Sequence, residues 1–173
     1  MFLELIATIF AGIAAAGVVM LLNKLMGGRL PKWLVPVGAG AAMIAVTISN
    51  EYGWFPRTKA ALPEGLIVVE TVETKAFYRP WTYLYPYVER FAALDKGSIK
   101  THKSRPDNKL ADMYYFGRWA PVHKLPVFTD CANPRRAALT DGVSFGEDGK
   151  IEGVDWVKVA ADDPTLVAIC GAG

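Results

Sequence analysis

Residues able to carry out chemistry are few in this sequence. The two cysteines, Cys131 and Cys170, and the two histidines, His102 and His123, show no metal-ligand spacing. A nucleophilic cysteine would need a free thiol beside one of the histidines. No nucleophile-elbow, phosphate-binding or haem-attachment motif is present in the sequence. We therefore expect a protein that is not an enzyme and that binds neither a metal nor a cofactor.

The cysteines themselves predict a structural role. A bridge between Cys131 and Cys170 would close a loop of roughly 40 residues and restrict the unfolded chain by about 4 kcal/mol. Since disulfides persist outside the cytoplasm, this pair predicts a disulfide in an exported domain. Two unrelated buried thiols are the alternative.

The densest run of aromatic residues, FYRPWTYLYPYVERF at residues 77–91, is the main candidate for binding. Every second residue from Trp81 to Tyr87 is aromatic, so these side chains would line one face of an extended segment. The candidate partner-binding residues are these four aromatic residues and two nearby arginines: Trp81, Tyr83, Tyr85, Tyr87, Arg79 and Arg90. A protein partner or lipid headgroups, an aromatic core layer and a ligand-stacking groove all stay open as uses of this face.

Charge is distributed unevenly along the chain. The first 50 residues carry only Glu4, Lys24, Arg29 and Lys32, whereas the remainder holds equal numbers of basic and acidic residues. The formal net charge of +2 therefore comes from the N-terminal segment. A neutral domain lacks the clustered basic surface that nucleic-acid binding requires, so no nucleic-acid partner is expected.

Two apolar segments predict transmembrane helices. Residues 5–22 and residues 34–49 contain no charged side chain. Each approaches the roughly 20 residues that cross a bilayer once its flanking residues are included. A signal peptide is disfavoured because no Lys or Arg precedes the first segment, and a buried soluble helix is the alternative for the second. Small residues at four-residue spacing suit packing of the two helices as a hairpin, or against a third helix from another protein.

The short loop between these segments predicts the topology. It contains Lys24, Arg29 and Lys32, and positively charged loops stay in the cytoplasm. We therefore expect a two-pass protein of the bacterial inner membrane, with its N-terminus and C-terminal domain on the periplasmic side. Aromatic side chains flanking the second segment are the expected membrane-interface residues: Trp33, Tyr52, Trp54 and Phe55.

Beyond residue 50 the pattern changes. Residues 51–65, with Pro56 and Pro63, predict an extended connector. Period-two alternation then predicts a mostly antiparallel β domain with two short helices. The expected strands are residues 66–76, 111–119, 122–129, 143–145, 151–159 and 165–170, with a hairpin turn at Asp148-Gly149. The expected helices are residues 86–94 and a segment capped by Asn133 that stops before Gly142.

The predicted fold is a membrane α-helical hairpin (residues 1–50), a connector (51–65) and a small, mostly antiparallel β (α+β) periplasmic domain (66–173). We expect a non-catalytic accessory or assembly subunit of a larger bacterial inner-membrane complex, for example a respiratory or photosynthetic one. Its partners would be the other subunits and the lipid bilayer. The alternative is a membrane-anchored periplasmic module that binds a small ligand or a cell-wall fragment.

Overall fold

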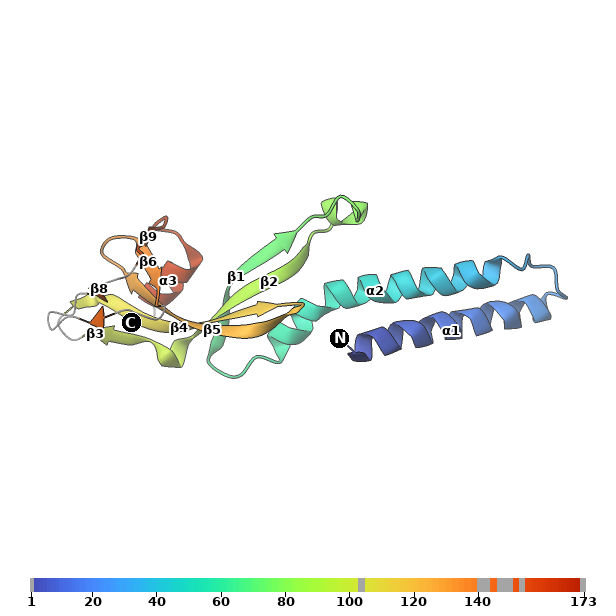
Figure 1. Cartoon of the computed structure of the whole chain (residues 1–173), viewed down its shortest axis with the longest axis horizontal. Helices are drawn as coiled ribbons and strands as arrows, with labels where there is room; N and C mark the ends of the chain where they lie inside the picture. Colours follow the sequence, from blue (N-terminus) through green and yellow to red (C-terminus); the bar gives the residue numbers. More distant parts are fainter. Residues whose placement is uncertain (1, 103–104, 140–143, 146–150, 153–154, 172–173) are drawn as a thin grey trace. The chain divides into compact units, whose positions relative to one another are not determined.

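The computed structural model describes residues 2–102, 105–139, 144–145, 151–152 and 155–171. Two long helices precede a series of strands and a short C-terminal helix (Figure 1). The helices are α1 (Phe2–Leu25), α2 (Leu34–Ala60) and α3 (Pro164–Cys170), with the 3₁₀ turns η1 (Pro80–Tyr83) and η2 (Lys96–Ser98). The strands are β1 (Leu66–Thr74), β2 (Tyr87–Asp95), β3 (Lys100–His102), β4 (Arg105–Gly117), β5 (Ala120–Asp130), β6 (Arg135–Ala138), β7 (Ser144–Phe145), β8 (Ile151–Glu152) and β9 (Val157–Lys158). The chain divides into two compact units, Met1–Arg57 and Thr58–Gly173.

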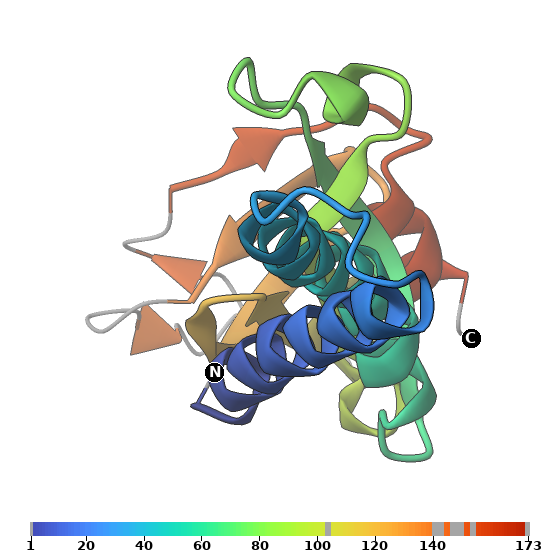
Figure 2. The same ribbon diagram turned by 90° about the vertical axis from the view of Figure 1, so that its right-hand side faces the viewer.

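The first unit is a pair of helices, α1 and α2, that lie side by side in both views (Figures 1 and 2). Within the described residues, these are the two helices long and apolar enough to cross a membrane. A Cβ added at Gly12 would lie 2.9 Å from the Met43 side chain, and one added at Gly38 would lie 2.9 Å from Val19. The two glycines therefore allow close approach of the helices.

The tight connection between the helices depends on backbone conformations that favour glycine. Gly27 and Gly28 have φ angles of 71° and 76°, in the left-handed region that terminates helices. Asn23 completes the turn, because its side-chain Oδ1 accepts a hydrogen bond from the Leu30 N–H at 2.9 Å.

The prediction of an extended connector over residues 51–65 is wrong for its first ten residues. Helix α2 continues through Pro56 and ends at Ala60. Pro56 removes one hydrogen bond from a 27-residue helix, a local cost that the remaining bonds of the helix tolerate. Turn bonds from Ala61 and Leu62 follow, and Pro63 then prevents a further helical turn.

The second unit is a curled antiparallel half-barrel (Figure 1). Its described strands form one sheet in the order β1-β2-β4-β5-β6-β9, with β3 paired to the first part of β4. A separate ribbon pairs β7 with β8. The predicted strands at residues 66–76, 111–119 and 122–129 correspond to β1, β4 and β5. The predicted turn at Asp148-Gly149 lies outside the described residues.

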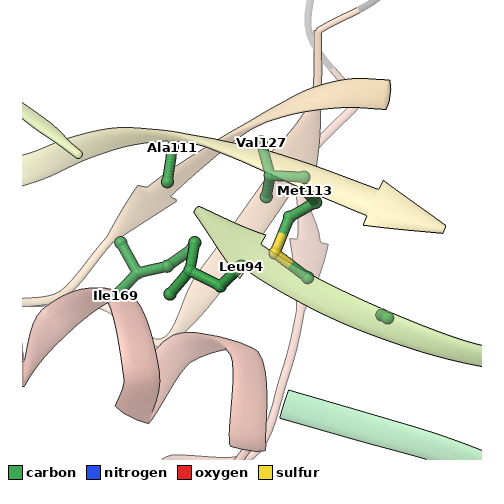
Figure 3. Close-up of a cluster of buried hydrophobic side chains, with 6 residues drawn as sticks. Leu94, Ala111, Met113, Val127 and Ile169 are labelled. Carbon is green, nitrogen blue, oxygen red and sulfur yellow. The ribbon is translucent and has the colours of Figure 1, made fainter. Parts of the chain in front are cut away.

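Helix α3 packs on one face of this sheet, which we call the inner face (Figure 3). Ile169 of α3 is fully buried against Leu94, Met113, Ala111 and Val127, which come from β2, β4 and β5. Burying side chains of this size contributes about 1.5–3 kcal/mol each. This cluster is the core of the second unit, and it occupies only part of the inner face.

Two further interactions hold α3 in place. A disulfide joins Cys131, just after β5, to Cys170 at the end of α3, with a Cα–Cα distance of 5.9 Å. The predicted disulfide is therefore confirmed, and the alternative of two free thiols is wrong. The buried Lys109 Nζ donates to the carbonyl oxygens of Ile169 at 3.3 Å and Cys170 at 3.0 Å, which the end of a helix leaves unpaired.

The helix predicted at residues 86–94 is instead strand β2. This strand lies inside the sheet, and Phe91, Ala92, Ala93 and Leu94 are all buried. Leu94 faces α3, whereas Phe91 stacks on Phe116 with ring centroids 4.7 Å apart. Burial on both faces removes the alternation that marks a strand in the sequence.

The helix predicted after Asn133 and the strand predicted at residues 165–170 are also wrong. Asn133 caps no helix, because the Asp130 carboxylate accepts hydrogen bonds from the backbone of residues 132 and 133 and from Arg135, forming a turn into β6. These bonds hold the pKa of Asp130 below its usual value, although burial alone would raise it. Residues 165–170 belong to α3, where Asp163 caps the Leu166 N–H and Pro164 starts the helix.

Removing the disulfide should destabilise the folded second unit. We expect the double substitution Cys131→Ser and Cys170→Ser to lower the free energy of unfolding by about 4 kcal/mol, because the unfolded chain gains the freedom of the opened loop. Urea unfolding of the detergent-solubilised full chain, followed by tryptophan fluorescence, measures this change. An unfolding midpoint equal to that of the unmodified protein would contradict this role of the disulfide.

Candidate functional site: the exposed aromatic loop

The segment between β1 and β2, residues 75–86, carries most of the predicted binding residues, and we call it the aromatic loop. It ends a hairpin that extends past the ladder with β4, since β2 pairs with β4 over Arg90–Leu94 while its pairing with β1 continues to Tyr87 (Figure 1). A β-bridge joins Ala76 and Arg79, and η1 follows at Pro80–Tyr83. The loop is therefore a folded structure and not an extended strand.

A single buried threonine organises the aromatic loop. The Thr82 hydroxyl is fully buried; it accepts a hydrogen bond from the Ala76 N–H at 2.9 Å and donates one to the Arg79 carbonyl at 2.7 Å. The Thr82 N–H also donates to the Arg79 carbonyl, at 2.9 Å. Thr82 thereby ties the two sides of the loop together, because a buried hydroxyl and the backbone groups it pairs are costly to separate.

Large apolar side chains are left on the outside of this framework. We call them the exposed cluster: Phe77, Tyr78, Tyr83, Leu84 and Tyr85. Their exposed fractions run from 58% for Tyr83 to 85% for Phe77. Isolated exposed apolar residues are common on protein surfaces, but five within nine consecutive residues form a patch typical of an interaction surface.

The four alternating aromatic residues do not share one face, contrary to the expectation for an extended segment. Tyr83 and Tyr85 belong to the exposed cluster, Trp81 is half-buried, and Tyr87 is buried at the start of β2. The 3₁₀ geometry of η1 turns successive side chains by about a third of a circle, which replaces strand alternation. The sequence analysis missed Phe77, Tyr78 and Leu84 as members of the patch.

The two predicted arginines separate in the structure. The Arg79 guanidinium lies over the Tyr78 ring, 5.2 Å from its centroid, and within 5.9 Å of the Tyr87 ring. Arg90 lies on β2, away from the loop, and lines a different feature described below. The loop contains Lys75 and Arg79 and no acidic residue, so its surface combines apolar area with positive charge.

A second candidate site is a hollow of about 500 Å³ on the sheet of the second unit. The side chains that matter for its chemistry are Glu70, Val72, Arg90, Tyr115, Pro121 and His123. Burial raises the pKa of the Tyr115 phenol; Arg136 opposes this rise and the Glu70 carboxylate adds to it. The phenol therefore remains a hydrogen-bond donor at neutral pH.

The predicted membrane-interface residues differ in exposure. Trp33, just before α2, is 61% exposed, whereas Tyr52 and Phe55 are half-buried. Trp54 is buried. Among these four residues, Trp33 is therefore the most exposed.

A cysteine–histidine nucleophile is not formed by the described residues. Both cysteines are oxidised in the disulfide, so neither offers the free thiol that a nucleophile requires. His123 lines the hollow. Within the described parts of the chain, no three His, Cys, Asp or Glu side chains are placed to hold a metal ion.

Comparisons of the chain with protein-family models, with curated proteins and with solved structures find no match.

Replacing the central threonine should loosen the aromatic loop while the sheet remains folded. Thr82→Val keeps the side-chain shape but leaves the Ala76 N–H without its hydroxyl partner, at a cost of about 1–3 kcal/mol. We expect amide hydrogen exchange in residues 76–85 to accelerate about tenfold or more. Thr71→Val, at an exposed position on β1, is the matched control. Unchanged exchange in the Thr82→Val loop would contradict the organising role of Thr82.

Proposed function

We propose that the chain is a non-catalytic accessory or assembly subunit of a larger bacterial inner-membrane complex, such as a respiratory or photosynthetic one. Its helical pair would anchor it in the bilayer, and its half-barrel would lie on the periplasmic side. The observation that carries this proposal is the exposed cluster on the aromatic loop. A surface of this composition is costly to leave in water, and it gains most from docking on another protein.

The side-chain types of the exposed cluster support a protein interface. Tyrosine is enriched at binding hot spots because it combines a large apolar area with a polar tip and few rotatable bonds. Tyr78, Tyr83 and Tyr85 are each at least 58% exposed. Thr82 already fixes the backbone between them, so little conformational freedom remains to be lost on binding. Lys75 and Arg79 favour a partner surface that carries acidic residues.

The first unit supports membrane anchorage in the same proposal. Large apolar side chains on both helices are exposed, including Phe10, Ile13 and Leu21 of α1 and Val37 and Ile44 of α2. An apolar helix with this much exposed apolar surface suits a lipid environment, where the hydrocarbon chains cover it.

A second candidate function is a membrane-anchored module that binds a small ligand. The hollow lined by Glu70, Arg90 and Tyr115 favours it, because ligand sites are typically apolar hollows of about 300–1,000 Å³ with a few convergent polar groups. The hollow does not include the exposed cluster, so both functions can reside in one domain.

The docking role is tested by removing apolar area from the loop. We expect the triple substitution Tyr83→Ser, Leu84→Ser and Tyr85→Ser to weaken assembly by about 2 kcal/mol for each hot-spot side chain. After gentle detergent extraction from the native membrane, the unmodified chain should migrate on a native gel in a large, defined band. The triple variant should migrate near its own mass of 18.9 kDa plus detergent.

A matched control separates docking from general loss of apolar surface. Trp119, Val122 and Val157 are exposed elsewhere in the second unit, at 52–57%, somewhat less than the loop residues. The control variant Trp119→Ser, Val122→Thr and Val157→Thr should stay in the large band. If the loop variant, with its disulfide intact, also migrates in the large band, the docking proposal is wrong.

The proposed topology has a separate test. Lys96 is exposed in the second unit, and Met26 is exposed in the connection between the helices. We expect a membrane-impermeant maleimide to label Lys96→Cys in intact spheroplasts and to label Met26→Cys only after permeabilisation. This follows from cytoplasmic retention of the loop that holds Lys24, Arg29 and Lys32. The reverse labelling pattern would overturn the orientation.

A further inference from the structure

The inner face of the half-barrel is only partly covered by α3. Leu94 pairs with Met113 in the row of residues beneath α3. The next row along the same face runs Glu70, Ala92, Tyr115 and His123, from β1 across β2 and β4 to β5. Residues two apart on a strand share a face, so this row lies on the same face as the core, and Ala92 belongs both to the core cluster and to the lining of the hollow.

Small residues make the floor of the hollow. The buried Ala92 lies in the middle of this row, at the border between core and hollow, and Gly117 lies in the following row between Arg90 and Ala120. A Cβ added at Gly117 would lie 3.1 Å from the Ala120 Cβ and 3.7 Å from the Arg90 Cγ. The aliphatic stem of Arg90 therefore lies close to the glycine. Because Ala92 and Gly117 are small and the residues around them are larger, a hollow of about 500 Å³ remains above them.

The acidic group beside this floor lies on a different strand from the hydrogen-bond donors. Glu70 lies on β1, whereas Arg90, Tyr115 and His123 lie on β2, β4 and β5. None of these four side chains has a hydrogen bond or ion pair with another described residue. Glu70 and Arg90 are diagonal neighbours across the β1–β2 pair, a position where Cα atoms lie about 7–8 Å apart. A ligand carrying both charges could therefore meet both side chains.

We infer that the hollow binds one zwitterionic phospholipid, with its phosphate at Arg90, Tyr115 and His123 and its ammonium at Glu70. The apolar floor formed by Ala92 and Gly117, beside Val72 and Pro121, receives the first part of an acyl chain. Arginine and phenol donors match phosphate oxygens, and a carboxylate matches a primary ammonium. The inference rests on the membrane anchorage in the proposed function, which places the domain beside a supply of lipid, and it does not depend on the aromatic loop.

The test uses the full chain in detergent micelles and native mass spectrometry. Phosphatidylethanolamine is titrated against phosphatidylglycerol, which keeps the phosphate but lacks the ammonium. We expect one retained phosphatidylethanolamine with at least tenfold tighter apparent binding than phosphatidylglycerol. Glu70→Gln should reduce this preference, because the uncharged amide no longer attracts the ammonium. Arg90→Gln should weaken binding of both lipids.

A charge-matched control guards against lipids bound elsewhere on the chain. The site variant Glu70→Gln and Arg90→Gln should lose the retained lipid, with at least tenfold weaker apparent binding. The control variant Glu73→Gln and Lys158→Gln changes the same charges at exposed positions outside the hollow and should bind normally. Intact mass confirms the disulfide in every variant.

Three outcomes would overturn the inference. Equal lipid retention by the site and control variants would remove the hollow from the binding site. Equal binding of phosphatidylethanolamine and phosphatidylglycerol by the unmodified chain would remove the role of Glu70. Binding of water-soluble glycerophosphoethanolamine as tight as that of the lipid would assign the hollow to a free small zwitterion. None of these results bears on the native-gel test of the docking loop, so the two proposals can fail separately.

Discussion

The attachment of α3 to the inner face of the sheet is the constraint on which the second unit depends. A helix of seven residues has almost no stability by itself, because helix nucleation is costly. Here Ile169 is fully buried in the core, Lys109 donates to the last carbonyls, and the Cys131–Cys170 disulfide fixes the helix end to β5. Without α3, Leu94 and Met113 would lose their cover, and the half-barrel would expose its core.

The same constraint sets what remains free for function. Because α3 covers only part of the inner face, the next rows of the sheet form the hollow with Arg90 and Tyr115. The aromatic loop lies at the end of the β1–β2 hairpin and has its own organising residue, Thr82. The half-barrel therefore holds two separate surfaces: the exposed, mainly apolar aromatic loop, and the hollow, which is lined by side chains of opposite charge. The proposed docking depends on the exposed cluster of the aromatic loop, whereas the proposed lipid binding depends on the residues that line the hollow.

The sequence predicts the long apolar helices, the strands with one buried face and the disulfide, since each leaves a direct pattern in residue type or spacing. It fails for β2, because burial on both faces hides the two-residue period of a strand. It also fails for α3, because the apolar residues 165–170 resemble a strand although Asp163 and Pro164 start a helix there. The hollow could not be predicted, because a β-bulge between Val68 and Glu70 shifts the alternation in β1. Ile67 before the bulge and Val69 in it pack on the core, whereas Glu70 and Val72 after it line the hollow.

The central claim is that the aromatic loop docks on another protein of the membrane. Site-specific photo-crosslinking in native membranes tests it most directly, with a benzophenone amino acid in place of Tyr85 and, as a control, in place of Trp119 on the β4–β5 turn. Both side chains are exposed, at 70% and 56%. The account predicts one defined protein adduct from position 85 and none from position 119. Adducts only to lipid at position 85, or the same protein adducts from both positions, would contradict it.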